Sequence, residues 1–204
     1  MRISYAILTH NEGTCIDMLL ATLLEFKDPE DEIIVVDDYS DDTLTRQILQ
    51  DFKQAKHIKL YQNRLSGDFA GQKNFLMSKC TGDFIFNIDA DELPVPELLV
   101  NLKDILHANP EVDMYAIPRK NYVHGLTDEH IKKWHWHVND AGLVNWPDNQ
   151  MRIIKNNGDI KWENKVHEVP SGFRKFAFIP DEYALIHEKT ISRQEQQNSF
   201  YDTI

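Results

Sequence analysis

FIFNIDADE, residues 84–92, is the stretch that decides the fold class. Its first half is of strand length and apolar except for Asn87, and its second half is acidic, with Asp89 and Asp91 on either side of Ala90. Strands that are apolar at successive positions are typical of parallel sheets covered on both faces. The stretch therefore predicts a buried strand that ends in carboxylates.

Two further apolar runs precede it, at residues 3–8 and 33–36, and residues 57–61 alternate weakly as a third strand. Apolar residues at helical spacing lie between these segments, over residues 16–24, 44–52 and 69–77, and Asp41 or Asp42 is placed to cap the second helix. Alternating strands and helices predict an α/β fold with a mostly parallel central sheet and helices on both faces. Right-handed crossovers then bring the carboxyl ends of the strands to one edge.

The second half of the chain has a different pattern. It predicts a helix over about residues 94–108, a strand near 114–118 and a polar terminal helix from residue 191. Residues 119–147 are rich in aromatic residues and histidine with little periodicity, so we expect an irregular insertion there. Residues 151–154 and 160–162 flank an Asn-Gly turn and predict a small antiparallel hairpin.

Composition limits the class of protein. The 204 residues are 42% hydrophobic and 27% charged, values of an ordinary globular domain, which we expect to span residues 1–204. The net charge of −11 argues against binding nucleic acid by general electrostatics. Cys15 and Cys80 are too few for a disulfide framework, and we find no apolar run of membrane-spanning length. We expect a cytoplasmic protein without a transmembrane segment.

Polar side chains follow three of the predicted strands: Asn11 and Glu12, Asp37 and Asp38, and Asp89 and Asp91. The carboxyl edge of an open α/β sheet is where ligands bind. Paired carboxylates at such an edge repel each other unless a cation compensates, and hard divalent ions complete their shells with phosphate oxygens. The simpler alternative is that Asp91 and Glu92 only cap the following helix. The glycine patterns of dinucleotide folds and of P-loops are missing.

Several motifs occur together in a recognisable order: ILTHNE at 7–12, VVDDYSDDT at 35–43, GDFAGQKN at 67–74, and TGD at 81–83 leading to DADE at 89–92. This order resembles family 2 glycosyltransferases of the GT-A fold. WPDNQMR at 146–152, Trp162 and VHE at 166–168 resemble the bacterial lipopolysaccharide-core glucosyltransferase branch. The resemblance covers about residues 3–190. It departs from the family at Tyr39, Lys73 and Ile153, where glycine, arginine and leucine are usual.

The resemblance implies a donor site in residues 1–92 and an acceptor site in residues 93–204. Asp38 would accept the imino hydrogen of a pyrimidine, and Lys73 would face the diphosphate. Asp91, with Asp89 nearby, would hold Mn²⁺ or Mg²⁺ between the two phosphates. His167 is the expected third ligand of the metal, and His187 is its rival. The full set expected to bind the nucleotide sugar is Thr9, Asn11, Glu12, Asp38, Asp68, Gln72, Lys73, Asp89 and Ala90.

An inverting transfer also needs a base that takes the proton of the acceptor hydroxyl. Asp148 is the first choice and Glu168 the second. The sequence is explained equally well if Asp148 only forms a turn and Glu168 only forms a salt bridge. Aromatic rings stack on sugars or on bases, so the acceptor is expected near Tyr122, Trp134, Trp136 and Arg152.

Together these features predict a metal-dependent, inverting glycosyltransferase whose donor is a nucleotide diphosphate sugar, with UDP the nucleotide that the resemblance favours. The expected acceptor is a hydroxyl of a glycan or of a lipid-linked molecule. A nucleic-acid acceptor is disfavoured by the net charge. Two alternatives stay open: an inactive module that binds nucleotide sugars, and a nucleotidyltransferase, whose usual glycine-rich segment after the first strand is missing here.

Overall fold

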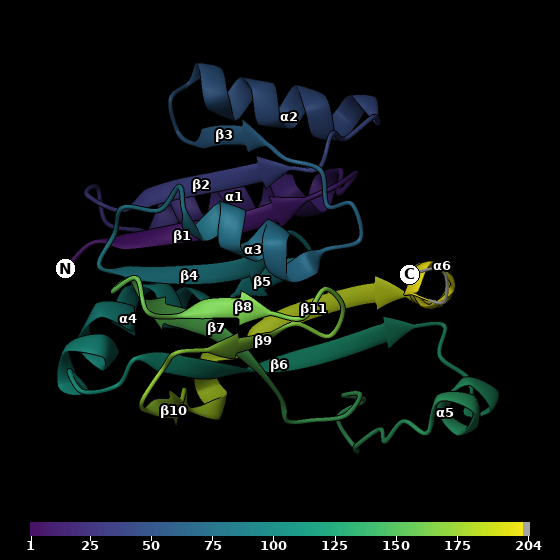
Figure 1. Cartoon of the computed structure of the whole chain (residues 1–204). Coiled ribbons are helices and arrows are strands. Elements are labelled where there is room, and N and C mark those ends of the chain that lie inside the picture. Colours follow the sequence, from purple (N-terminus) through teal and green to yellow (C-terminus); the bar gives the residue numbers. More distant parts are fainter. Residues whose placement is uncertain (202–204) are drawn as a thin grey trace.

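A computed structural model describes residues 1–201 (Figure 1). The elements of the first half are β1 (Ile3–Thr9), α1 (Thr14–Phe26), β2 (Glu32–Asp37), α2 (Thr43–Gln54), β3 (Lys59–Gln62), α3 (Phe69–Met77), β4 (Phe84–Asp89), β5 (Glu92–Pro94) and α4 (Pro96–Ala108). Those of the second half are β6 (Met114–His124), α5 (Asp128–Trp134), β7 (Asp148–Lys155), β8 (Lys161–Glu163), β9 (Val169–Ser171), β10 (Phe176–Phe178), η1 (Asp181–Tyr183), β11 (Leu185–Thr190) and α6 (Ile191–Tyr201).

Within residues 1–201, nine strands form one sheet in the order β3-β2-β1-β4-β7-β6-β11-β5, with β10 also paired to β6. Strands β1 to β4 run parallel, and β6 and β11 run in the same direction because β7 lies antiparallel between β4 and β6. The carboxyl ends of β1, β2, β4, β6 and β11 therefore share one edge, at the right of Figure 1.

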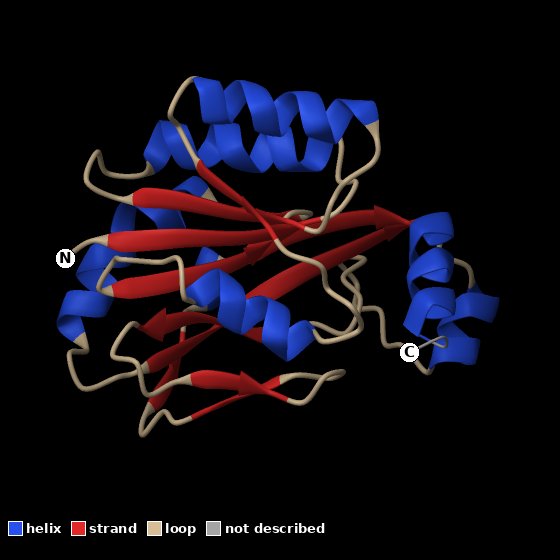
Figure 2. Cartoon of the chain, turned by 45° about the horizontal axis from the view of Figure 1, so that its top comes forward, coloured by secondary structure: helices blue, strands red, loops and turns tan. Residues whose placement is uncertain are grey.

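Helices cover both faces of the sheet (Figure 2). Successive side chains of a strand point to opposite faces. Tyr5 and Ile7 of β1 accordingly join the core beneath α1, α2 and α4, whereas Ala6 joins a second core beneath α3. The alternation explains why β1 carries apolar residues on both of its faces.

Short polar residues start the helices as the sequence suggests. Asp42 Oδ1 accepts a hydrogen bond from the Thr45 amide at 2.8 Å, and Asp68 Oδ1 accepts one from Gly71 at 2.8 Å. Asp42, rather than Asp41, is thus the N-cap of α2. Pro96 occupies the first turn of α4, where a missing amide hydrogen costs nothing.

The predicted α/β class, with its mostly parallel sheet and its small antiparallel pair, is confirmed. Three details of the prediction were wrong. The antiparallel pair consists of β8 and β9, because both edges of β7 are already taken by β4 and β6. β6 continues to His124, since β7 and β11 pair with it on either side, and α5 adds order to the expected insertion. A short strand, β5, precedes α4.

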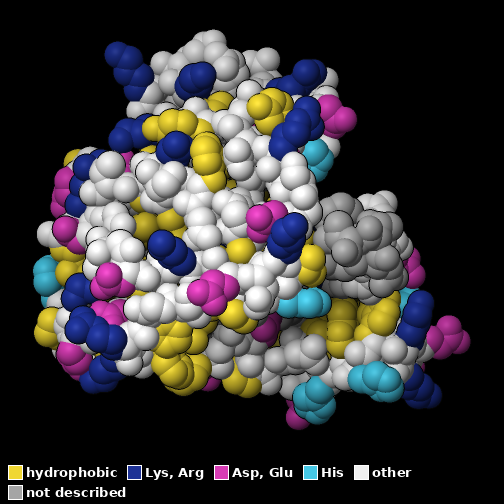
Figure 3. Space-filling model, viewed as in Figure 1, with side chains coloured by type: hydrophobic (Ala, Val, Ile, Leu, Met, Phe, Trp, Pro, Cys, Tyr) yellow, Lys and Arg dark blue, Asp and Glu magenta, His cyan; other side chains and the backbone are white. Residues whose placement is uncertain are grey.

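Among residues 1–201, none of the helices has both the length and the apolar character that crossing a bilayer takes. On the face shown in Figure 3, basic and acidic side chains are interspersed.

Candidate active site at the carboxyl edge of the sheet

A large and a small cavity adjoin each other at the carboxyl edge. The large cavity, of about 590 Å³, is lined by Leu8, His10, Asn11, Glu12, Phe69, Lys73, Asp89, Ala90, Asp91, Arg119, Glu168, His187, Arg193, Gln196 and Gln197. The small cavity, of about 240 Å³, is lined by Arg119, Asn121, Val123, Trp136, Val144, Asn145, Asp148, Lys189 and Gln194. Arg119 lines both cavities, so its side chain is a wall that the two spaces share.

A buried ion-pair network lies beneath the large cavity. Arg152, whose side chain is 3% exposed, donates from Nη2 to Asp89 and to Glu92. Arg119 donates from Nη1 to the same Glu92 oxygen at 2.9 Å. Burial raises the pKa of Asp89, but the charges of Arg152, Lys73 and Arg119 outweigh it and hold that pKa well below its usual range. Asp89 is therefore ionised and fixed in place.

A chain of hydrogen bonds sets the tautomer of His187. Asn121 Nδ2 donates to Asp148 Oδ2 at 2.8 Å, and an ionised carboxylate can only accept. The Asn121 oxygen must then face His187 Nδ1, which lies 2.7 Å away and donates to it. This network assigns the hydrogen of a neutral His187 to Nδ1 and leaves the lone pair on Nε2.

The Nε2 lone pair of His187 points at Asp91. His187 Nε2 lies 3.2 Å from Asp91 Oδ2. Burial raises the pKa of Asp91, but the hydrogen bond and charge of a protonated His187, with the charge of Arg193, lower it below its usual value, so the carboxylate is ionised. When His187 is neutral, Nε2 and Asp91 Oδ2 are both acceptors, and either a proton on Nε2 or a cation held between them satisfies the pair. An imidazole and a carboxylate converging on one point suit a divalent transition metal.

Arg193 of α6 reaches the same point from the C-terminal end. Its Nη2 donates to Glu12 and lies 3.2 Å from Asp91 Oδ2. Burial raises the pKa of Glu12, although Arg193 opposes the effect. The edge of the large cavity thus combines Asp91, His187 and one guanidinium, which together suit a ligand that carries phosphate groups.

The residues expected around the nucleoside lie at the ends of β1 and β2. Asn11, in the left-handed region at φ 56°, lines the large cavity, and its side-chain oxygen accepts from the amides of Asp41 and Asp42 at 2.9 and 3.1 Å. Asp38 Oδ1 accepts from the Leu65 amide at 3.1 Å. Thr9 is buried, and its hydroxyl finds no partner among the residues that the structure describes.

The expected residues of α3 divide into two groups. Asp68 caps the helix, and the buried Gln72 exchanges hydrogen bonds with Asn63. Lys73 lines the large cavity, where its Nζ lies 2.6 Å from Glu168 Oε1 and 4.1 Å from the centre of the Trp162 ring. The structure therefore brings Lys73 and Glu168 together in the large cavity.

Asp148 lies in the small cavity. Its Oδ2 accepts from Arg119 Nε and Nη2 at 2.9 and 2.7 Å and from Asn121, and its Oδ1 accepts from Gln150 at 2.6 Å. Burial raises the pKa of Asp148, but the charge of Arg119 lowers it below its usual value. Each carboxylate oxygen has two lone pairs, so Oδ1 keeps one acceptor position free for a substrate hydroxyl.

The other expected residues lie in three places. Trp136 lines the small cavity and packs against Trp134 at 4.8 Å between ring centres. Tyr122 and Arg152 are not among the residues that line either cavity. His167 is exposed and forms no ion pair or hydrogen bond with Asp91 among the residues described, whereas its rival His187 contacts Asp91.

Sequence reasoning missed Arg119, Asn121, Lys189 and Arg193. Arg119 and Asn121 are two residues apart on β6 and therefore share a face, a signal that appears only when the predicted strand is extended beyond residue 118. Burial, with Arg119 nearby, lowers the pKa of Lys189 to about 8. Arg193 belongs to a polar helix with no local signal of its contact with Asp91.

Comparison with known proteins gives the class of the chain. Residues 4–178 match the model of the family described as Glycosyl transferase family 2, so the chain belongs to this family. The predicted resemblance is thereby confirmed.

Two curated relatives carry glycosyltransferase names. The chain is 29% identical over 145 residues to the lipopolysaccharide core biosynthesis glycosyltransferase LpsC of Rhizobium meliloti, a match that covers 69% of the chain and 48% of the relative. It is 26% identical over 171 residues to the SPbeta prophage-derived glycosyltransferase SunS of Bacillus subtilis, covering 84% of the chain and 35% of the relative. The chain thus spans about half the length of these relatives or less.

Solved structures share the GT-A fold. S. aureus TarS in complex with UDP-GlcNAc superposes with a TM-score of 0.67 at 20% identity, over 93% of this chain and 59% of that one. The mannosyltransferase PcManGT of Pyrobaculum calidifontis, in complex with GDP-Man and Mn²⁺, gives a TM-score of 0.51 at 25% identity, over 58% of this chain and 36% of that one.

Proposed function

We propose that this chain is a metal-dependent, inverting glycosyltransferase that moves a sugar from a UDP-sugar to a hydroxyl of a glycan or of a lipid-linked acceptor. The observation that carries the proposal is the facing pair of acceptors, Asp91 Oδ2 and His187 Nε2, at the edge of the large cavity. Family membership, the TarS complex with UDP-GlcNAc and the PcManGT complex with GDP-Man support a nucleotide-sugar donor.

The large cavity is the proposed donor site. Its volume of about 590 Å³ lies within the range of roughly 300–1,000 Å³ that is usual for small-molecule sites. Asn11 and Glu12 would contact the nucleoside, and Lys73 and Arg193 would contact the diphosphate. Most of the lining comes from residues 1–92, whereas the whole lining of the small cavity comes from residues 93–204, which supports a donor half and an acceptor half.

Asp91 and His187 would hold the divalent metal, with His187 in the role that the sequence suggested for His167. When bound, Mn²⁺ or Mg²⁺ supplies positive charge that stabilises the departing diphosphate. Asn121 keeps the His187 lone pair directed at the site by accepting from Nδ1. Asp89, paired with Arg152, contributes negative charge beside this position.

Asp148 is the proposed base, and Glu168 is the second candidate. Oδ1 of Asp148 takes the proton of the acceptor hydroxyl while the hydroxyl oxygen bonds to the anomeric carbon. The bond from that carbon to the diphosphate oxygen breaks on the opposite side, and UDP leaves with its electron pair. Arg119, which donates to Asp148 and lines both cavities, fixes the base at their junction.

The cytoplasm is the proposed location. Cys15 and Cys80 are both free thiols, as is usual in a reducing compartment.

A matched pair of histidine variants tests the function. UDP-sugar hydrolysis and UDP binding are measured against Mn²⁺ concentration for the wild type, His187→Ala and His167→Ala. We expect His187→Ala to weaken the apparent Mn²⁺ affinity at least about tenfold and His167→Ala to leave it unchanged. The reverse order would move the metal to His167. Product analysis separates the two remaining classes: a nucleotidyltransferase releases pyrophosphate, and an inactive binding module binds UDP-sugar without turnover.

A further inference from the structure

The cations of the site differ in their partners. Arg119, Arg193 and Lys73 line the two cavities, and each forms an ion pair with a carboxylate. Lys189, which lines the small cavity, forms no ion pair within residues 1–201, and its Nζ donates a hydrogen bond to the Gln197 side-chain oxygen at 3.3 Å. The small cavity therefore contains a positive charge that no carboxylate of the described chain neutralises by direct contact.

A second group in the small cavity also lacks a partner. Gln194 is 6% exposed, and its Nε2 donates to Asn198 at 2.7 Å. Its side-chain oxygen is buried and has no hydrogen-bond donor among the residues described. An unsatisfied buried acceptor is destabilising, and a hydroxyl donor from a ligand in the cavity would satisfy it.

The remaining lining adds shape and chemistry. Trp136 offers an aromatic ring on which a sugar can stack, and Asp148 keeps an acceptor position free for a hydroxyl. The cavity, at about 240 Å³, is of the size of one monosaccharide unit. A ligand that meets every one of these groups carries hydroxyls and one anionic group on a ring.

We propose that the small cavity binds an anionic sugar as the acceptor, with its phosphate or carboxylate on Lys189 and one hydroxyl on the Gln194 oxygen. This inference rests on the proposed function, because it takes Asp148 as the base for the acceptor. It adds the acceptor's chemical class and two residues that determine specificity.

The test begins with the donor cavity filled. Titration calorimetry first measures binding of UDP with Mg²⁺, and failure at this step contradicts the proposed function rather than the acceptor class. With UDP and Mg²⁺ in excess, methyl glucoside, glucuronate, glucose 6-phosphate and inorganic phosphate are then titrated at constant ionic strength. We expect at least one charged sugar to bind about tenfold or more tightly than methyl glucoside, as a charge-assisted hydrogen bond predicts. Whichever of glucuronate and glucose 6-phosphate binds more tightly shows whether carboxylate or phosphate is the natural anionic group.

Lys189→Met should abolish this preference without changing UDP binding. Lys53→Met, on exposed α2, makes the same charge change away from the site and should keep the preference. Gln194→Leu should weaken both charged sugars several-fold and leave inorganic phosphate unaffected.

Several results would overturn the proposal. They are equal or absent binding of charged and neutral sugars, a preference that survives Lys189→Met, and inorganic phosphate binding as tightly as glucose 6-phosphate. Separate titrations with UDP-glucose and with UDP-glucuronate give one further result that would overturn the proposal. If Lys189→Met weakens only UDP-glucuronate, Lys189 serves the donor sugar, and the acceptor assignment is wrong.

Discussion

Replacing Arg152 with methionine tests whether the buried ion-pair network holds the carboxyl edge together. The Arg152 side chain is 3% exposed, and that of its partner Glu92 is fully buried. Removing one partner of a buried ion pair costs about 3–5 kcal/mol. Glu92 keeps Arg119 at 2.9 Å, and methionine preserves the apolar stem, so we expect the lower end, about 3 kcal/mol.

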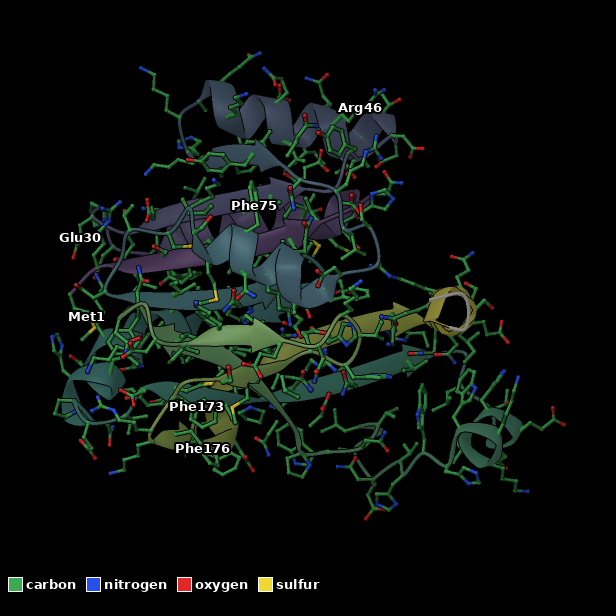
Figure 4. All side chains as sticks on the ribbon, in the orientation of Figure 1. Met1, Glu30, Arg46, Phe75, Phe173 and Phe176 are labelled. Atoms are coloured by element: carbon green, nitrogen blue, oxygen red, sulfur yellow. The ribbon has the colours of Figure 1, made fainter. Side chains whose placement is uncertain are left out.

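The assay is urea unfolding at pH 7, followed by tryptophan fluorescence, together with a thermal scan. For a chain of this size, a loss of about 3 kcal/mol lowers Tm by roughly 6–12 °C. Arg46→Met is the control, because Arg46 is exposed on α2. Figure 4 shows Arg46 at one end of the molecule, with Phe173 and Phe176 at the other. That variant should stay within about 0.5 kcal/mol of the wild type.

A double variant distinguishes the unpaired charge from lost packing. Arg152→Met combined with Glu92→Met also removes the buried carboxylate that only Arg119 would still neutralise, while Arg119 keeps Asp148. It should be more stable than Arg152→Met alone, since apolar replacement of a whole buried pair is often neutral. The reasoning is refuted if Arg152→Met is as stable as the wild type, or if the double variant is the less stable of the two.

Three further predictions concern the base, the metal ligand and the amino-terminal edge of the sheet. Asp148→Asn should lower kcat by about 10²–10⁴-fold with UDP binding unchanged, measured by UDP release, whereas Asp140→Asn on the exposed loop should have no effect. Asn121→Leu removes the hydrogen bond that orients His187 and should weaken Mn²⁺ binding about 10–100-fold, measured by competition with a chelator. Equal Mn²⁺ affinity in Asn121→Leu and in the wild type would refute the assignment of the His187 tautomer. Burial raises the pKa of Glu32, but hydrogen bonds from Lys59, Ser4 and Thr81 bring it down to about 2. The ionised Glu32 therefore stabilises the folded protein at a pH above its unfolded pKa of about 4.3. This stabilisation disappears as the pH falls to about 2. Glu32→Gln should therefore cost about 3 kcal/mol at pH 7 in urea unfolding, with a difference from wild type that shrinks below pH 4; a constant difference would contradict this.

The parts of the fold that local patterns specify were predictable. Apolar runs located β1, β2 and β4, and their polar ends placed Asn11, Glu12, Asp89 and Asp91 at one edge of the sheet. Those runs are short and buried on both faces, so the pattern and the structure agree.

The rest depends on pairings between distant segments. His187 reaches Asp91 because β11 pairs with β6 and β5, a contact between residues 96 positions apart that no local pattern encodes. For the same reason the sequence favoured His167, which lies in a recognisable motif. Arg152 also lies in a recognisable motif, residues 146–152, but only the pairing of β7 with β4 shows that it is buried against Asp89 and Glu92.

We propose above all that Asp91 and His187 hold a divalent ion, and that this chain needs the ion to transfer sugar from a nucleotide diphosphate sugar. The most direct measurement is UDP formed from a panel of UDP-sugars, with Mn²⁺ or with chelator, by wild type and Asp91→Asn. We expect UDP release that requires the metal and is lost in a folded Asp91→Asn protein. Absence of UDP release and of metal-dependent UDP binding by the folded wild type would contradict it, as would full activity in Asp91→Asn.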